Sequence, residues 1–519
     1  MFNKDWFYRS IWMMCVMLLS AWTSNVFAQA TYSYDVLRMT QHVPGQDAHS
    51  IGLGSSSAAQ LQGFGSFLVN PAVAAKNSSS FISIGLGIRE VTQESVFPLG
   101  ETADFGQRNT LDDHQTGLLN FGFSYEVPTV VGSLVVGGGY AQTADYNSAY
   151  SINAFNDLTS RTFRFTSDYI GRHGVGYTAF ALDSLNGDLL SIFEFGGYAG
   201  VDQVADIKYR GQSGEYSLFL ATEFQKDLFV GVSVGIPVSR SSFSQTFFEY
   251  APLDFYTGEA GTGTFNIDQI HFEESVKVDA VGLNARLGFL YSGLPLIDIG
   301  ASYTTRTRWN IEERLDAFVQ SRFQGNQVIE DGEVIEDGNV FSDEFRGEIS
   351  YKATTPSRIH IGASTKDLPL VNFSVSTERI NYSNIRLRGF DVEFRENERF
   401  ENNYINQNFQ NVWNFRAGAT VTMFDAVEPR VGWAWMGNPR NYIDNNERHF
   451  LSAGLGIGMS QRLGLDFAIQ YGFWESTEDL YQSPFYYDAD GEFVFEPVIE
   501  EIEVDMDRFH VTFGITYRF

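Results

Sequence analysis

The chain has 519 residues, 43% hydrophobic and 15% aromatic, with 49 glycines but only 13 prolines. A single core stops growing at about 250–300 residues, so this chain forms several domains, a repeat array or a closed β-barrel. No fixed repeat runs along it, which excludes solenoids and propellers. Its 64 acidic and 35 basic residues give a net charge of −29, which excludes nucleic acid as a partner.

Residues 1–28 have the pattern of a secretory signal peptide. Lys4 and Arg9 form a short basic region, residues 11–21 are mostly apolar, and small residues precede the expected cleavage site. The single cysteine, Cys15, lies inside this segment, so the mature chain has none. No later segment approaches the length of uninterrupted apolar sequence that a membrane helix needs.

Residues 29–79 come before the first predicted strand and are rich in glycine, serine and alanine. Such a segment ahead of a barrel forms either a flexible periplasmic tail or a plug folded inside the lumen. Apolar residues such as Leu53, Phe64 and Phe67 favour the plug, because they need a surface to pack against.

Residues 80–519 alternate between apolar and small or polar side chains, which is the period of a β-strand with two different faces. The non-apolar face is mostly Gly, Ser, Asn and single charges, whereas a soluble sandwich would expose Lys, Glu and Thr there. This pattern predicts an all-β fold, a transmembrane antiparallel barrel of about 14 strands with an N-terminal luminal plug. In the last strand the apolar face consists of Phe509, Val511, Phe513, Ile515, Tyr517 and Phe519.

The connections between the predicted strands alternate between tight and long. The strands are predicted at 80–91, 115–127, 131–146, 214–226, 228–248, 267–292, 296–315, 343–365, 369–393, 402–423, 427–437, 448–460, 463–478 and 504–519. The long connections, each after an odd-numbered strand, are 92–114, 147–213, 249–266, 316–342, 394–401, 438–447 and 479–503. Because outer-membrane barrels have short periplasmic turns and long external loops, this parity places the C-terminus in the periplasm.

The stretch from Tyr34-Asp35-Val36-Leu37-Arg38, through Gly52-Leu53-Gly54 and Ala58-Ala59, to Asn70-Pro71-Ala72 resembles the N-terminal region of FadL-type outer-membrane transporters. Those transporters carry long-chain fatty acids and other hydrophobic compounds. Their barrel has fourteen strands and an N-terminal hatch with a short Asn-Pro-Ala signature, which Asn70, Pro71 and Ala72 match residue by residue.

This resemblance implies passive transport of hydrophobic small molecules, such as long-chain fatty acids, across the bacterial outer membrane. It implies no cofactor, and it implies that Asn70, Pro71 and Ala72 border the bound substrate. Family members of similar architecture also serve as secretion-system barrels. A binding or secretion partner therefore remains an alternative to a transporter, and an outer-membrane enzyme is a second one.

Gly137, Gly138 and Gly139 follow one another inside the third predicted strand. Successive glycines weaken a strand, but they permit a bulge or an inward kink. In the FadL-type family a kink in the third strand opens a side port, so the resemblance implies a lateral exit at these glycines. The alternative is that they let the plug approach the wall.

The predicted loop 147–213 carries many apolar side chains, which form either a capture groove for a hydrophobic solute or a packed lid. Several arginines either hold an anionic head group or pair with Glu378, Asp298 or Asp466 inside the lumen. The arginines are Arg161, Arg164, Arg172, Arg286, Arg306, Arg308, Arg358 and Arg416.

Motifs for catalysis or metal binding are absent from the sequence. Its eight histidines are scattered, and it has no zinc-type His pair, nucleophile elbow or phosphate loop. The acidic runs at 328–338 and 488–507 match no calcium-binding loop and are expected to be solvated loops. We therefore expect no catalytic residue and no metal. The expected partners are a hydrophobic or fatty-acid substrate, outer-membrane lipid and lipopolysaccharide, and the barrel assembly machinery.

Overall fold

The computed structural model describes residues 31–519 except 57, 60–62, 78, 97–108, 167–171, 186–187, 195–196, 253–256, 261–262, 325–326, 331–332, 338–339, 367, 369, 392–394, 425, 444, 489–490, 492 and 496–497. The predicted signal peptide, residues 1–28, lies outside the described residues. Within this part of the chain, no helix is long and apolar enough to cross a membrane.

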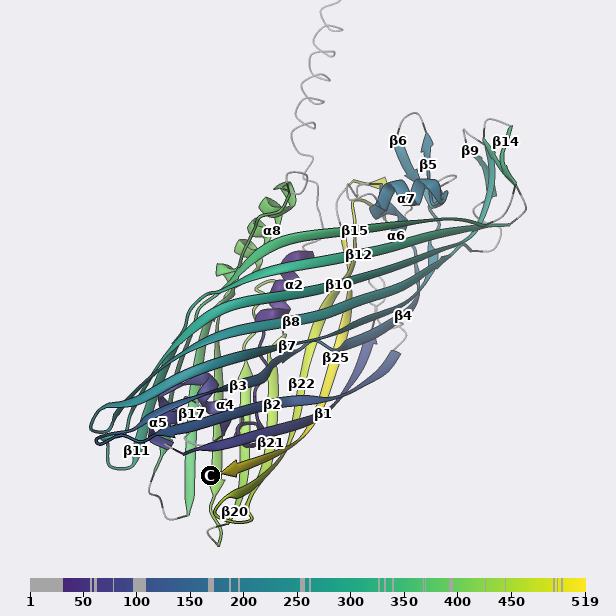
Figure 1. The fold of residues 1–519 in the computed structure, drawn as a ribbon. Coiled ribbons are helices and arrows are strands. Elements are labelled where there is room, and N and C mark those ends of the chain that lie inside the picture. The colour runs from purple at the N-terminus through teal and green to yellow at the C-terminus, as the bar shows by residue number, and fades with distance from the viewer. Residues whose placement is uncertain are drawn as a thin grey trace, which may run out of the picture.

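The strands close into one antiparallel barrel of 14 strands, as the alternation predicts (Figure 1). The first strand pairs with the second on one side and with the last on the other, and this pairing closes the sheet. Four of the wall strands are interrupted and consist of two segments each. The pairs of segments are β3 with β4, β11 with β12, β15 with β16, and β17 with β18. In chain order the wall consists of β1 (Phe81–Val96), β2 (Asn109–Val127), β3 (Leu134–Asp145), β4 (Ser148–Asn156), β7 (Val201–Gln225), β8 (Leu228–Tyr250), β10 (Gly263–Tyr291), β11 (Ile297–Thr304), β12 (Thr307–Phe323), β15 (Val340–Thr355), β16 (Arg358–Thr365), β17 (Val371–Asn381), β18 (Arg386–Arg388), β19 (Asn411–Val421), β20 (Val427–Met436), β21 (Arg448–Gly458), β22 (Leu463–Ser483) and β25 (Val498–Arg518).

Short and long connections alternate around the barrel, which confirms the predicted parity. The shortest joins β7 to β8 through Lys226 and Asp227, and Asp227 has a φ of 63° there. The other predicted tight turns also lie between successive wall strands. The periplasmic orientation of this end stays a prediction.

The outward face of each strand is apolar near the tight turns. On β10 the outward side chains from Val281 to Tyr291 are apolar and exposed, whereas the next outward residue, Asp279, is charged. On β8 the change falls between Ile236 and Arg240. A strand needs about 9–11 tilted residues to cross a bilayer, which is the length of this stretch. We call these outward apolar residues the apolar band, and they define a transmembrane barrel.

The predicted loop 147–213 is wrong at both ends, because β4 begins at Ser148 and β7 begins at Val201. This part of β7 lies beyond the apolar band, so its outward side chains, such as Asp206 and Lys208, are polar. Its inward side chains, such as Ile207, are apolar and buried. In this part of β7 the apolar face is therefore the inward one, whereas in the apolar band it is the outward one. A sequence search for strands with an outward apolar face does not detect this part. Several other strands also run past their predicted ends into segments predicted as loops, namely β1, β2, β8, β12 and β15.

The predicted strand 402–423 is wrong in its first half, where helix α8 (Arg395–Asn408) stands. Glu401, Ile405 and Phe409 are all buried. They follow one another at intervals of four residues, which puts them on one side of a helix. Three-residue β18 likewise replaces the end of the predicted strand 369–393.

The N-terminal helices lie among the inward side chains of the barrel, in purple in Figure 1. They are α2 (Thr31–Thr40), α3 (Ala48–Gly52), α4 (Phe64–Val69) and α5 (Ala72–Asn77). Hydrogen bonds join them to separate parts of the wall: Ser302 Oγ of β11 donates to the Val69 carbonyl at 2.7 Å, and Gln470 Nε2 of β22 donates to the Pro44 carbonyl at 3.3 Å. We call the described residues of 31–77 the hatch segment.

The C-terminal residue Phe519 generates a first prediction. It is 61% exposed, and its backbone N–H donates to the Ser80 carbonyl at 3.1 Å beside the first strand. Deleting Phe519, or changing it to Asp, is expected to lower the amount of assembled barrel several-fold, because we expect an assembly machinery to recognise the terminal aromatic strand. Heat-modifiable barrel in isolated outer membranes measures this. Phe495→Asp, at an exposed loop aromatic, is the matched control; unchanged barrel levels without Phe519 would refute the prediction.

Candidate functional site

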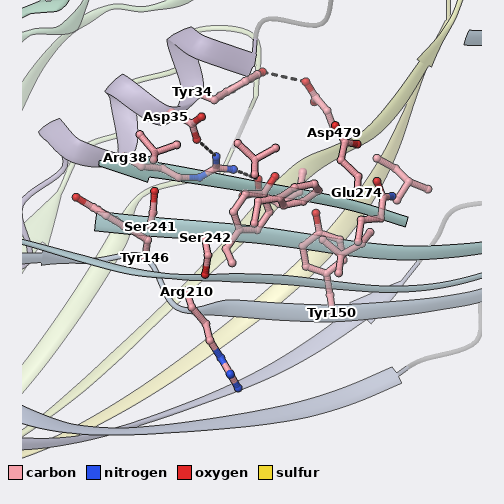
Figure 2. A pocket seen from close by; sticks show the side chains of 18 of the residues that line it. Tyr34, Asp35, Arg38, Tyr146, Tyr150, Arg210, Ser241, Ser242, Glu274 and Asp479 are labelled. Carbon is pink, nitrogen blue, oxygen red and sulfur yellow. Dashed lines mark hydrogen bonds and ion pairs between the residues drawn. The ribbon is translucent and has the colours of Figure 1, made fainter. Parts of the chain in front are cut away.

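A narrow cavity of about 70 Å³ lies between α2 and the inward faces of β7, β8, β10 and β22 (Figure 2). We call it the upper cavity. Its apolar lining comes from Ile207, Phe243, Val276, Val278 and Leu480. Its polar lining includes Tyr34, Asp35, Arg38, Tyr146, Tyr150, Arg161, Arg164, Glu274 and Asp479. A cavity with both kinds of lining suits an amphipathic molecule.

The polar side of the upper cavity is organised by α2. Arg38 donates to Asp35 at 3.2 Å and lies with its guanidinium carbon 4.1 Å from the centre of the Tyr209 ring. Tyr34 donates to Asp479 at 3.1 Å. Burial raises the pKa of the Asp35 carboxyl, although Arg38 opposes this, and burial also raises the pKa of the Tyr34 hydroxyl. The helix therefore presents the Arg38–Asp35 ion pair and the Tyr34 hydroxyl to the cavity.

Four of the eight predicted arginines are paired with carboxylates. Arg358 and Arg416 contact Glu378 at 2.8 and 2.6 Å, as predicted. Arg161 pairs with Glu274 at 3.3 Å and Arg286 pairs with Glu215 at 3.2 Å. Asp298 and Asp466 pair instead with Lys76 and Arg430, each at 2.5 Å. Arg306 and Arg308 are exposed, and the side chain of Arg172 lies outside the described residues.

A second cavity, of about 80 Å³, adjoins the first. We call it the lower cavity. Its lining includes Asp145, Asn147, Arg448, Trp474 and Arg508. It shares Arg38, Tyr146, Tyr209 and Glu478 with the upper cavity, so these four side chains form a common partition.

The wall is interrupted beside the lower cavity. The ladder between β2 and β3 runs from Val127 and Leu134 only as far as Asn120 and Ala141. Beyond that point the third strand stays paired with β7, and among the described residues 109–119 of β2 have no ladder partner on this side. We call the stretch between residues 109–119 and 142–147, where the two segments have no ladder pairing, the third-strand gap.

Side chains take the place of the ladder across the third-strand gap. Asn147 Nδ2 donates to Gln115 Oε1 at 2.7 Å, and Arg89 donates to Asp145 at 2.8 Å. Gln93 donates to Ser148 Oγ at 3.1 Å and accepts from the Ala149 N–H. Because Arg89 and Gln93 are buried, inward-facing residues of β1, the third strand beyond the gap lies inside the wall.

The three glycines of the third strand are not at this interruption. Gly137, Gly138 and Gly139 have register partners on both β2 and β7. A Cβ on Gly138 would lie 2.6 Å from the Ser217 carbonyl oxygen, and one on Gly139 would lie 2.8 Å from the Phe64 ring of the hatch segment. The predicted break in the ladder at these glycines is therefore corrected to the residues that follow Ala141. Their close contacts fit the alternative, an approach of hatch to wall.

The Asn-Pro-Ala trio lies between the hatch segment and the wall. Asn70 Nδ2 donates to the carbonyls of Ala58 and Phe289 at 2.7 and 2.9 Å, and its Oδ1 accepts from Ala72 N at 3.2 Å. Neither cavity described above is lined by Asn70, Pro71 or Ala72. Their contact with substrate stays a prediction, whereas their contact with the wall is direct.

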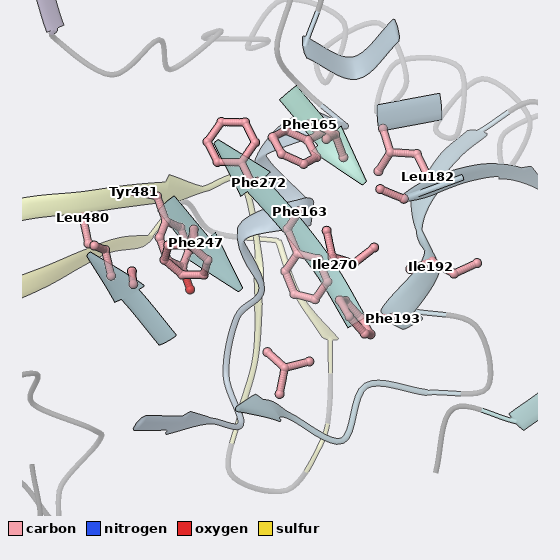
Figure 3. Packing of buried hydrophobic residues seen from close by; sticks show 14 of the residues in the cluster. Phe163, Phe165, Leu182, Ile192, Phe193, Phe247, Ile270, Phe272, Leu480 and Tyr481 are labelled. Carbon is pink, nitrogen blue, oxygen red and sulfur yellow. The ribbon is translucent and has the colours of Figure 1, made fainter. Parts of the chain in front are cut away.

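Several aromatic residues predicted in an external loop form a packed lid over the upper cavity, whereas Phe155 and Tyr177 are exposed. Phe163 and Phe165 of α6 (Arg161–Phe165), together with Phe193, are fully buried. They pack with wall residues such as Phe247 and Phe272 in one cluster (Figure 3). The sequence left a capture groove and a packed lid as alternatives, and these three residues belong to a packed lid.

The sequence analysis did not single out the residues that bridge the third-strand gap. On β1 the inward neighbours of Arg89 and Gln93 are small or apolar. Gln142 and Asp145 lie three and six residues after Gly139. The sequence does show long polar side chains on inward strand faces. Which of them meet across the gap depends on the three-dimensional path of the third strand.

Comparisons with known proteins agree with this architecture. No protein-family model and no curated protein matches the sequence. Among solved structures, the chain is similar to a Pseudomonas aeruginosa FadL homologue, with 12% identity over 92% of this chain and 99% of that chain and a TM-score of 0.55. It is also similar to the toluene transporter TodX of P. putida, with 14% identity over 92% and 99% and a TM-score of 0.51.

These similarities and the closed barrel define the class of fold. The chain has the fold of the FadL-type outer-membrane β-barrels, which confirms the resemblance found in its sequence.

A buried glutamate joins the hatch segment to α8. The carboxylate of Glu401 accepts from the backbone N–H groups of Tyr32 and Ser33, at 3.3 and 2.9 Å, in the first turn of α2. Glu401 is 1% exposed, and burial raises its pKa from 4.5 to about 8 despite these hydrogen bonds. The folded arrangement therefore favours the protonated carboxyl.

A second prediction concerns the pH dependence of this contact. Since the folded pKa of Glu401 lies above the unfolded one, its contribution to docking of α2 is fully present below about pH 4.5 and is lost as pH rises through about 8. Hydrogen exchange of residues 31–40, corrected for intrinsic rates, is expected to accelerate over this window. Glu401→Gln should remove the dependence, whereas Glu398→Gln, on the half-exposed side of α8, should retain it. Equal pH dependence in all three proteins would contradict the prediction.

Proposed function

We propose that this protein transports hydrophobic small molecules passively across the bacterial outer membrane. The observation that carries the proposal is the end of the β2–β3 ladder at Asn120 and Ala141, beside a cavity inside the barrel. If the side chains across this gap part, the lumen is joined to the upper edge of the bilayer. A solute that dissolves in lipid gains from such a route, since it avoids the polar groups of the lumen.

The orientation follows from the lengths of the connections. The tight turns face the periplasm, and the long loops with the lid face outward. The C-terminus is then periplasmic. The predicted signal peptide, with no cysteine after it, is consistent with export.

The upper cavity is the proposed binding site. Its apolar lining takes the hydrocarbon part of a long-chain fatty acid or a similar compound, and its polar lining takes the head group. Arg38 lines both cavities and is the proposed contact for a carboxylate, which would compete with Asp35 and Glu478 for its guanidinium. Moving past Arg38 and Tyr146 then brings the solute to the lower cavity.

The hatch segment is the proposed plug. Its helices contact β8, β10, β21 and β22, so it fills the space that a straight path through the barrel would need. Lys76 ties its end to Asp298 at 2.5 Å, and Asn70 ties its centre to β10. Because this path is filled, the exit lies in the wall, at the third-strand gap.

A third prediction tests the plug. Deleting residues 31–75 is expected to convert a closed barrel into a conducting one, because the lumen is otherwise filled by these residues. Single-channel conductance in planar bilayers measures this, with heat-modifiability as the check that the variant barrel has assembled. A variant that assembles and keeps the conductance of the wild type would show that the hatch segment does not close the lumen.

A fourth prediction tests the exit. The mature chain is expected to lack cysteine, so Gln115→Cys with Asn147→Cys places the only thiol pair across the gap. A short bifunctional thiol reagent is expected to reduce uptake of a labelled fatty acid or aromatic hydrocarbon to the background rate, and cleavage of the link should restore it. The physical reason is that the gap can no longer widen.

The matched control links positions where the ladder is intact. Phe121 and Tyr140 are register partners on β2 and β3, and Phe121→Cys with Tyr140→Cys should leave uptake unchanged after treatment. Uptake that is equal in the two linked proteins argues against lateral exit. If the wild type shows no uptake at all, a binding or secretion partner becomes the better interpretation.

A further inference from the structure

The charges at the upper edge of the apolar band are unevenly distributed around the barrel. On β1 and β25 the first charged outward residues after the band are acidic, Glu90 and Asp507. On β8 the first is Arg240, which pairs with Asp279 of β10 at 3.1 Å. On β12, β15 and β18 the charged outward residues near this edge include Arg308, Lys352 and Arg388, and all three are exposed.

These three cations are neighbours in the sheet. Lys352 is directly opposite Arg388 in the register of β15 and β18. Arg308 is opposite Thr354, two residues along β15 from Lys352. Like charges directly opposite each other destabilise a sheet unless a counter-charge lies between them.

No counter-charge comes from the described part of the chain. Neither Arg308, Lys352 nor Arg388 has a described carboxylate within ion-pair distance, although the cations further along the same wall do. Arg314 and Arg346, for example, pair with Glu348 and Asp316 at 3.7 and 3.5 Å. In a chain of net charge −29, three adjacent cations without an acidic partner call for an external anion.

The surface below the three cations is apolar and interfacial. The outward residues of β11, β16 and β17 include Ile299, Ile361 and Phe373, which are 43%, 47% and 54% exposed. On the adjoining strand Trp413 is 44% exposed, and Arg379 lies 5.8 Å from the centre of its ring. Exposed tryptophan beside a basic residue marks the level of lipid head groups.

We propose that Arg308, Lys352 and Arg388 bind the phosphate groups of a lipopolysaccharide molecule, whose acyl chains lie on the apolar surface of β11, β16 and β17. Guanidinium and ammonium groups are the usual protein partners of phosphate. This inference rests on the outer-membrane orientation of the proposed function, because the cations lie on the loop side of the band, where the leaflet consists of a phosphorylated glycolipid. It does not depend on transport.

The test measures the glycolipid that remains bound to full-length barrel extracted from outer membranes in mild detergent. Native mass spectrometry counts lipopolysaccharide per barrel, and heat-modifiability confirms assembly. Each cation near an anionic lipid surface contributes about 1 kcal/mol, so each neutral substitution should weaken binding about fivefold. Lys352→Gln alone should give a measurable loss, and the triple variant Arg308→Gln, Lys352→Gln, Arg388→Gln should lose nearly all bound glycolipid.

The matched control neutralises paired cations on the same wall, with Arg240→Gln, Arg314→Gln and Arg346→Gln. It should retain lipopolysaccharide at the wild-type level. Retention by the first triple variant, or equal loss from both, would overturn the proposal. Displacement of the bound glycolipid by phosphatidylglycerol at equal concentration would also overturn it, because the site would then be one for any anionic lipid. Uptake of the labelled substrate is measured in the first triple variant as well. If bound lipopolysaccharide falls while uptake stays unchanged, the loss reflects the glycolipid site and not a failure of the proposed transport.

Discussion

Backbone hydrogen bonding in a solvent without water is the constraint on which the rest of this structure depends. A polar group left unpaired in lipid costs several kcal/mol, so the wall closes on itself and β1 pairs with β25. The third strand departs from this rule at Ala141. Beyond the apolar band, Gln93 and Gln115 supply side-chain partners for the strand that has left the wall. An opening that is held by side chains can widen without unzipping a ladder.

The fit between the hatch segment and the wall depends on glycine. A Cβ on Gly231 of β8 would lie 2.5 Å from the backbone nitrogen of Ala72, and one on Gly288 of β10 would lie 2.9 Å from Pro71. Only glycine lets the two backbones approach so closely. The Asn-Pro-Ala turn is therefore held directly on the wall, whereas the upper cavity lies beside α2.

Much of the barrel could be predicted from strand segments whose outward side chains all face the same surroundings, namely lipid. The outward face of β10 from Val281 to Tyr291 meets only lipid, so its composition alone identifies it. Beyond Asp279 the same strand has water outside, and the apolar face moves to the inside. The predicted strands ended at such points, as β7 shows. The sequence pattern did not predict helix α8. Among its described side chains, Glu401 and Ile405 are buried, and they pack against α2 and the wall beside it.

The sequence by itself determined the class of fold, the number of wall strands and the alternation of turns and loops, because local alternation reports which solvent each face meets. It also indicated the pairing of Arg358 or Arg416 with Glu378. Only the tertiary structure decided where the ladder breaks, since Gln115 and Asn147 meet through a bend of the third strand that no local pattern encodes. The same holds for the cations at Lys352 and Arg388, which become neighbours only when β15 and β18 pair in one register.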